Sequence, residues 1–234
     1  MKTVFDILRR ESAESRPYHQ KIVFEYEEEG LTVALALRRI NAGGFMDETG
    51  APVRPVRWEE GCGQKKCGAC AMLINGQPGL ACDAFLSDLK KHRTVTLAPL
   101  KKFPCVADLL VDRSIMMENL MTLRQWAEDD ASVTEKGFDD AYNAALCLQC
   151  GCCLEACPNF YPGGGFFSAA AFAPQARLLS SLDDAHRKEV RRLYRDHIYE
   201  GCAKSLACEK VCPAGLPLDR LLSRSNGVKI WKRK

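Results

Sequence analysis

The chain has 234 residues, of which 47% are hydrophobic and 27% are charged, and its formal net charge is +3. This composition excludes a generally disordered chain, and so small a net charge gives no independent reason to expect nucleic-acid binding. No apolar run reaches the roughly 18 residues that a membrane span needs. The segment from Met1 to Asp6 lacks the apolar core of a signal peptide, so we expect a cytoplasmic protein.

The first hundred residues predict a small sheet packed on one helix. Residues 21–29 alternate between apolar and charged side chains, which is typical of a half-buried strand. Thr32 is a suitable N-cap for a helix that continues to about Asn41, where Gly43 and Gly44 follow.

Two further strands are expected after the first helix. Residues 71–74 are apolar and are followed by Asn75-Gly76, the strongest two-residue signal for a β-hairpin. Residues 94–97 contain the β-branched side chains that favour another strand. Such a sheet, with a cysteine-rich loop inside it, is consistent with a β-grasp ferredoxin fold.

The pattern becomes helical after Pro104. Apolar residues recur at helical spacing between residues 106 and 121, and residues 139–146 predict a helix that leads into a dense group of cysteines. Residues 181–198 predict another helix with one apolar stripe, which we interpret as core packing. We therefore expect an α+β chain, with a plant-type ferredoxin domain at 1–105 and an all-α, bacterial-ferredoxin-like domain at 106–234.

The chain contains 13 cysteines, an odd number that is unusual for a cytosolic protein and points first to metal ligation. Four of them have the plant-type [2Fe–2S] spacing, Cys62-x4-Cys67-x2-Cys70 followed by Cys82. The alternative is zinc, but zinc sites prefer two paired Cys-x2-Cys spacings, and only one such pair lies in this segment.

A second group has the spacing of bacterial ferredoxins, in which the fourth cysteine of a run usually serves a second cluster. The run from Cys147 to Pro158 and the segment from Cys202 to Pro213 both end in Cys-x3-Cys-Pro. An exchange of the last cysteine of each run predicts a [4Fe–4S] cluster on Cys147, Cys150, Cys153 and Cys212, and a [3Fe–4S] cluster on Cys157, Cys202 and Cys208.

Ser205 occupies the position at which the last cluster would have a fourth ligand. A hydroxyl has a far higher pKa than a thiol and is a harder ligand, so we expect Ser205 to border the cluster without holding a fourth iron. The three clusters together then carry about nine irons. Cys105 and Cys152 are left over, and we interpret both as small buried residues.

As a set, these motifs resemble the iron–sulfur subunit of the succinate dehydrogenase and fumarate reductase family. Residues 67–82 are similar to its [2Fe–2S] segment, and residues 106–112 are similar to its linker helix. The two later cysteine runs are similar to its remaining ligand runs, including the non-ligand Cys152.

The resemblance implies that a separate FAD-containing flavoprotein interconverts succinate and fumarate. This subunit would pass electrons between FAD, its three clusters and a quinone at a membrane anchor, which in some members binds haem. The chain itself would contain no catalytic residue, and it would lie at the cytoplasmic face of the membrane, attached through the anchor. The histidines are interpreted as surface residues: His19, His92, His186 and His197.

Two departures from the family pattern favour menaquinone as the quinone. Residues 159–165 contain no tryptophan, which quinone-reducing members often have after the fourth cysteine, and Ala203 replaces the histidine of many ubiquinone enzymes. The direction of turnover is not readable from the residues.

Two other classes of function remain open at this point. One is the iron–sulfur subunit of a different flavoprotein, and the other is a non-redox zinc-binding interaction module.

Two basic segments lead to further predictions. Lys65 and Lys66 should raise the potential of the [2Fe–2S] cluster, and residues 220–234, with six basic side chains and Trp231, should face a partner or remain solvated.

Overall fold

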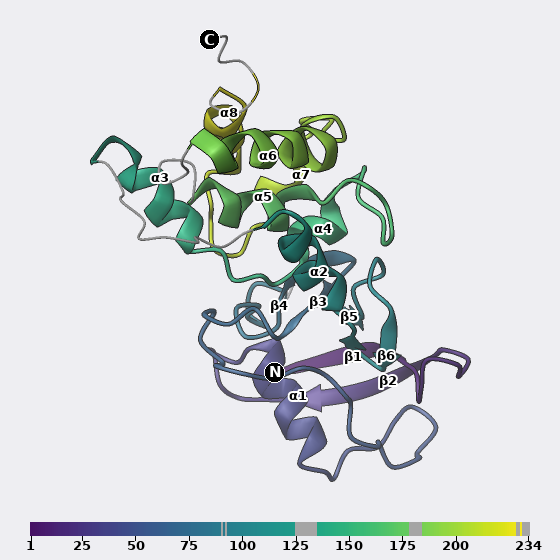
Figure 1. Cartoon of the computed structure of the whole chain (residues 1–234). Helices are drawn as coiled ribbons and strands as arrows, with labels where there is room; N and C mark the ends of the chain where they lie inside the picture. The colour runs from purple at the N-terminus through teal and green to yellow at the C-terminus, as the bar shows by residue number, and fades with distance from the viewer. Residues whose placement is uncertain (90, 92, 125–134, 178–183, 228–229, 231–234) are drawn as a thin grey trace. The chain divides into compact units, whose positions relative to one another are not determined.

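The computed structural model describes residues 1–89, 91, 93–124, 135–177, 184–227 and 230. They form two compact units, Met1–Asp112 and Arg113–Lys234, which are described separately. The first contains a sheet with one helix, and the described part of the second is helical, so the α+β prediction is confirmed (Figure 1). Within the described ranges, no helix is long and apolar enough to cross a membrane.

The first unit is built on a mixed five-stranded sheet with the order β2-β1-β5-β3-β4 (Figure 1). β1 pairs antiparallel with β2 and parallel with β5, whereas β3 pairs antiparallel with both β4 and β5. The strands are β1 (Lys2–Arg9), β2 (Tyr18–Glu25), β3 (Ala71–Ile74), β4 (Gln77–Leu80) and β5 (Thr94–Ala98).

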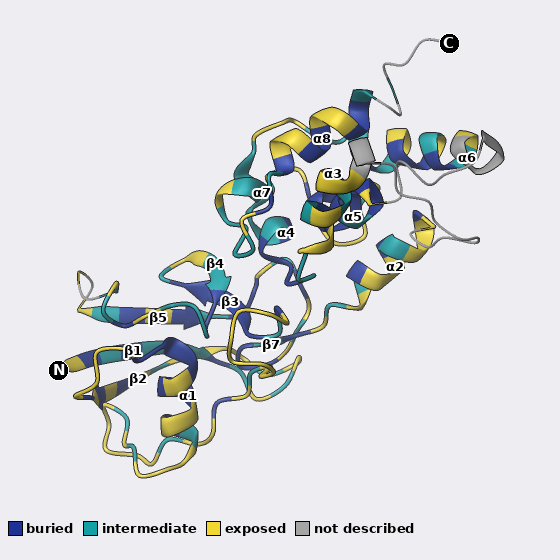
Figure 2. Cartoon of the chain, turned by 90° about the vertical axis from the view of Figure 1, so that its left-hand side faces the viewer, coloured by how far each residue is buried: buried dark blue, intermediate teal, exposed yellow. Residues whose placement is uncertain are grey.

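Alternation of buried and more exposed residues along β1 and β2 places one face of this sheet in a core. Phe5 of β1 and Phe24 of β2 are fully buried and meet edge to face, with ring centroids 5.6 Å apart. The strand predicted at residues 21–29 is confirmed as β2, although it begins and ends a few residues earlier. Helix α1 (Val33–Asn41) contributes its apolar side to the same unit, and its opposite face is exposed (Figure 2).

Both local signals of the first unit act as predicted. The Thr32 hydroxyl accepts a hydrogen bond from the Leu35 backbone N–H at 3.3 Å, which caps α1 at its N-terminus. Asn75 and Gly76 have φ values of +49° and +77°, and this left-handed pair closes the hairpin between β3 and β4.

The prediction of a helix over residues 106–112 is wrong. This segment forms a two-stranded antiparallel ribbon of β6 (Cys105–Ala107) and β7 (Leu110–Val111). Asp108 lies at the turn with a φ of +45°, and its buried carboxylate accepts hydrogen bonds from Arg9 Nε at 2.9 Å and from the backbone N–H of Arg57 at 2.9 Å. These distant contacts override the local helical spacing.

The second unit consists of short helices around a common core. The predicted helices at 139–146 and 181–198 are observed as α3 and as α6 with its π-helical continuation η1, while residues 181–183 lie outside the described residues. The helices are α2 (Ser114–Thr122), α3 (Glu135–Ala145), α4 (Cys152–Ala156), α5 (Ser168–Ala176), α6 (Asp184–Tyr194), η1 (Arg195–Tyr199), α7 (Ala207–Lys210) and α8 (Leu218–Asn226).

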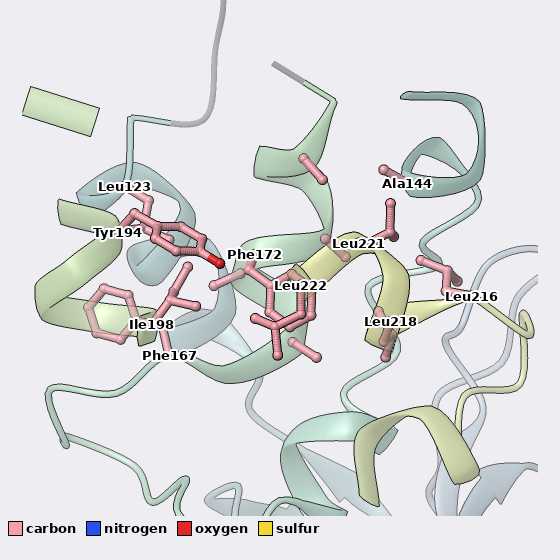
Figure 3. Close-up of a cluster of buried hydrophobic side chains, with 14 of the residues drawn as sticks. Leu123, Ala144, Phe167, Phe172, Tyr194, Ile198, Leu216, Leu218, Leu221 and Leu222 are labelled. Carbon is pink, nitrogen blue, oxygen red and sulfur yellow. The ribbon is translucent and has the colours of Figure 1, made fainter. Parts of the chain in front are cut away.

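Helix α5 is the centre of this unit, since nearly every residue along it is buried (Figure 2). Figure 3 shows Phe172 of α5 among the side chains of Tyr194, Ile198 and Leu222, which come from the two helical segments on either side. The Tyr194 hydroxyl donates a hydrogen bond of 2.7 Å to Asn226 Oδ1, so its polar end is satisfied inside the core.

Helix α8 also explains part of the basic segment at the end of the chain. Arg220 Nε lies 3.2 Å from Asp140 Oδ1, and Arg224 pairs with the other oxygen of the same carboxylate. These two side chains therefore join α8 to α3 while remaining about half exposed, and the expectation that the segment faces a partner stays a prediction. Lys229, Trp231 and the basic residues after it lie outside the described residues.

Candidate functional site

The first cysteine group lies on a loop whose backbone N–H groups point at sulfur atoms. Cys62 Sγ accepts hydrogen bonds of 3.3 Å from the backbone N–H groups of Gln64 and Lys66, and Cys82 Sγ accepts one of 3.3 Å from Lys65. Gly63 and Lys65 have left-handed φ values of +65° and +56°, which turn these donors inward. Such a nest of amides stabilises negative charge on thiolates.

Two thiols of this group, Cys62 and Cys70, have contrasting environments. The backbone N–H groups of Gln64 and Lys66 lower the pKa of Cys62 to about 7. Burial raises the pKa of Cys70 to about 12, and the neighbouring Cys82 thiol acts in the same direction. The exposed thiol ionises readily, whereas the buried one needs the positive charge of bound metal to become a thiolate.

The backbone also approaches the sulfurs closely in this loop. A Cβ atom added to Gly61 would lie 2.8 Å from Cys67 Sγ, so a larger residue there would displace this sulfur. Of the two lysines expected to act on this site, Lys65 forms an ion pair with Asp83 Oδ2 at 2.6 Å. The carboxylate offsets part of its charge.

The second unit contains two cavities that are lined by cysteines. One is bordered by α5 and by four thiols from two distant segments of the chain: Cys147, Cys150, Cys153 and Cys212. The other is bordered by α5, Ile198 and α8, and its polar lining includes Cys157, Cys202, Cys208 and Ser205. The structure therefore brings together both sets that were predicted from the exchange of the last cysteines.

Burial dominates the electrostatics of these thiols. It raises the pKa of Cys153 well above its ordinary value and raises that of Cys147 as well. Burial also raises the pKa of Cys208 to about 11, with the nearby Cys157 thiol as the next cause. Thiols of this kind remain protonated unless a metal centre compensates their charge, so the cavities suit metal ligation.

Cys152 and Cys105 differ from each other. Cys152 is fully buried, as predicted, and its thiol hydrogen-bonds to Cys150, which lowers the pKa of Cys150 to about 7. Cys105 is only partly buried, and its thiol donates to the Asp108 backbone oxygen at 3.5 Å, so the prediction of a buried residue is wrong there. Both remain outside the three predicted sets.

The histidines are only partly surface residues. His19 is exposed, as predicted. His197 is partly buried, because its ring stacks on Phe167 with centroids 4.3 Å apart and its Nδ1 lies 2.8 Å from the Gly165 backbone oxygen. His92 and the side chain of His186 lie outside the described residues.

The spacing of the donors also bears on the choice between zinc and a cluster. In the part of the chain that the structure describes, no group of three or more His, Cys, Asp or Glu side chains is arranged to hold a single metal ion. Zinc sites prefer paired Cys-x2-Cys motifs, whereas Cys62-x4-Cys67-x2-Cys70 and the run that begins at Cys147 have the spacings of ferredoxins.

Comparisons with known proteins agree with this arrangement. Residues 4–118 match the family described as 2Fe-2S iron-sulfur cluster binding domain, and residues 143–216 match the 4Fe-4S dicluster domain. The succinate dehydrogenase iron-sulfur subunit of Bacillus subtilis is 34% identical, over 96% of this chain and 92% of that protein. The chain belongs to the family of succinate dehydrogenase and fumarate reductase iron–sulfur subunits.

Other similar proteins share less sequence identity with this chain. The fumarate reductase iron-sulfur subunit of Wolinella succinogenes is 30% identical over 89% of this chain and 88% of that protein. A chain of the Mycobacterium smegmatis Sdh1 complex in the apo form has the same fold, with a TM-score of 0.72 at 19% identity over 97% of this chain and 96% of that chain.

Membership of the iron–sulfur subunit family confirms the predicted function class. The chain is an electron-transfer subunit of an oxidoreductase complex, and it carries [2Fe–2S] and [4Fe–4S] clusters. Iron–sulfur subunits of succinate dehydrogenase also carry a [3Fe–4S] cluster, as was predicted here.

Proposed function

We propose that this subunit carries electrons between an FAD-containing flavoprotein and a quinone at a membrane anchor, and that it lies peripherally at the cytoplasmic face of the membrane. The observation that supports this most strongly is the division of seven thiols between two cavities, each of which takes cysteines from both motifs of the second unit. With the loop of the first unit, this gives three redox centres in one subunit.

The proposed ligands follow the cavities and the loop. The [2Fe–2S] cluster is assigned to Cys62, Cys67, Cys70 and Cys82, the [4Fe–4S] cluster to Cys147, Cys150, Cys153 and Cys212, and the [3Fe–4S] cluster to Cys157, Cys202 and Cys208. The clusters supply the electron-accepting centres, while the chain holds the thiolates, donates N–H groups to them and partly or fully buries all of them except Cys62 and Cys67.

The proposed domains correspond to the two units. The sheet order β2-β1-β5-β3-β4 with one helix supports a β-grasp ferredoxin domain, and the helices after it support a bacterial-ferredoxin-like domain. We place their boundary after Asp112 rather than after residue 105, because Arg9 and Arg57 of the first unit hold Asp108.

The three-iron assignment depends on Ser205. Ser205 lines the cavity of Cys157, Cys202 and Cys208, and its Oγ accepts a hydrogen bond of 3.5 Å from the Ala207 backbone N–H. A neutral hydroxyl in this position is a poor iron ligand, whereas a thiolate would complete a [4Fe–4S] cluster. Ala203 in the same cavity offers a quinone no hydrogen bond from its side chain, which supports menaquinone bound elsewhere in the anchor.

The ligand assignment is tested by substitutions in the assembled complex. Cys212→Ser should remove the EPR signal of the reduced [4Fe–4S] cluster and leave the [3Fe–4S] signal, whereas Cys157→Ser should do the reverse. Addition of succinate to the wild-type complex should reduce the [3Fe–4S] cluster, which tests electron transfer from the flavoprotein. Loss of one and the same cluster in both variants would contradict the proposed exchange of cysteines.

A further inference from the structure

Gln149 joins a proposed ligand of the [4Fe–4S] cluster to the central helix of the second unit. Its side-chain Nε2 donates a hydrogen bond of 3.2 Å to Cys147 Sγ and another of 2.9 Å to the Ala170 backbone oxygen. Each of the two hydrogens of one amide group therefore has its own acceptor.

The second acceptor is available because of a proline. Pro174 lies inside α5, four residues after Ala170, and it has no N–H to donate to the Ala170 carbonyl. The Gln149 amide takes the place of that missing donor. Since Ala170 is buried, its carbonyl would otherwise lose a hydrogen bond without access to bulk water.

The two acceptors also determine which end of the amide faces the sulfur. A rotated amide would direct its oxygen at both the Ala170 carbonyl and the Cys147 sulfur, and both contacts would be repulsive. The nitrogen therefore faces the thiolate, and the amide contributes a donor to it.

The backbone of Gln149 has a left-handed conformation. Its φ is +50°, a conformation that glycine adopts without strain and that is unfavourable for glutamine. Gln149 and Cys147 both line the cysteine cavity and a neighbouring groove that is walled by Met117, Leu120 and Met121. The amide thus lies at the boundary between the cluster cavity and the outer groove.

We propose that Gln149 is a tuning residue that raises the reduction potential of the [4Fe–4S] cluster. A hydrogen bond to a ligand sulfur stabilises the more negative, reduced form of a cluster, so a donor at this position makes reduction easier. The inference rests on the proposed assignment of Cys147 as a ligand, and it goes beyond that assignment by giving a non-ligand residue a role in the potential.

The test is an EPR-monitored redox titration of the assembled complex. Gln149→Leu removes the donor and keeps a side chain of similar size, and Gln149→Gly removes the donor while relieving the left-handed backbone. Both should shift the midpoint of the [4Fe–4S] cluster to a more negative value and leave the other two midpoints unchanged. An unchanged [4Fe–4S] midpoint in a variant with full iron content would overturn the proposal.

The matched control is Asn143→Leu. Asn143 is a side-chain amide of the same unit that donates its hydrogen bond of 2.7 Å to the Asp139 backbone oxygen and not to a sulfur, so all three midpoints should stay at their wild-type values. A shift of the [4Fe–4S] midpoint in this variant as large as that in Gln149→Leu would show that the titration does not report on the Gln149 side chain, and it would count against the proposal.

A measurement on the wild-type complex covers the case in which the variants lose the cluster. With ¹⁵N placed in glutamine side-chain amides, the reduced [4Fe–4S] cluster should show hyperfine coupling to one such nitrogen, and absence of coupling would overturn the proposal. Cys147→Ala tests the underlying assignment separately, because alanine offers no ligand atom and retention of an intact [4Fe–4S] cluster in that variant would exclude Cys147 as a ligand.

Discussion

Gly201 lies against the ring of Phe166 so closely that a Cβ atom at position 201 would be 2.4 Å from the Phe166 ring. Gly201 directly precedes Cys202, a proposed ligand of the [3Fe–4S] cluster, and Phe166 lines the same cavity. Because Gly201 has no side chain, the Phe166 ring can pack directly against the backbone that precedes Cys202.

Gly201→Ala should move either Phe166 or the backbone that positions Cys202. We expect overpacking to destabilise the second unit by about 1–3 kcal/mol and to lower the yield of the [3Fe–4S] signal in the purified complex. Gly165→Ala is the matched control, because a Cβ atom there meets nothing within 4 Å. Equal [3Fe–4S] content in the two variants would show that the Phe166 contact does not matter for the cluster.

The Arg9–Asp108 pair should be important for the stability of the first unit. Both side chains are buried, and the Asp108 carboxylate also accepts from the backbone N–H groups of Arg10 and Arg57. Asp108→Ala leaves Arg9 without its charge partner and should cost about 3–5 kcal/mol of unfolding free energy. Denaturant unfolding followed by the visible absorbance of the [2Fe–2S] cluster measures this change.

The comparison for that experiment is an exposed ion pair on the same unit. Glu28 binds Arg39 through two hydrogen bonds of 2.7 and 2.8 Å at the surface. Glu28→Ala should leave the unfolding midpoint nearly unchanged, because exposed pairs are screened by solvent. Similar losses in the two variants would contradict the role assigned to burial.

Asp83 should lower the potential of the [2Fe–2S] cluster. Its carboxylate pairs with Lys65, which lies between two proposed ligands, and Asp83 directly follows Cys82. Asp83→Asn removes a negative charge and leaves the positive charge of Lys65 without its partner, so the midpoint of the [2Fe–2S] cluster should rise. Lys66→Gln removes a positive charge and should lower the same midpoint. Potentiometric EPR checks both signs, and a fall of the midpoint in Asp83→Asn would refute this account.

Ser205→Cys should convert the three-iron cluster to a [4Fe–4S] cluster. A thiolate at position 205 supplies the missing soft ligand, so the EPR signal of the oxidised [3Fe–4S] cluster should disappear and the iron content should rise by about one per chain. We also expect slower quinone reduction, because the converted cluster has a lower potential. Ser205→Ala is the control, and it should keep the three-iron signal.

Local signals predicted much of this structure. The Thr32 cap and the Asn75-Gly76 turn act through atoms a few residues away, so their effects were readable from the sequence. The two cysteine sets were also predictable, since cluster geometry limits the spacing of ligands along each run.

Features that depend on distant contacts were not predictable. Residues 106–112 have helical spacing, but Asp108 is held by Arg9, a contact that spans 99 positions in the chain. The contact of Gln149 with Ala170 similarly requires knowledge of where α5 lies.

Iron and acid-labile sulfide analysis of the intact, anaerobically purified complex, combined with EPR of the oxidised protein, tests the central claim most directly. The account predicts about nine irons per copy of this chain and a [3Fe–4S] signal before any reductant is added. A count of about ten irons with no such signal would contradict the three-iron assignment, and bound zinc in place of iron would contradict the electron-transfer function itself.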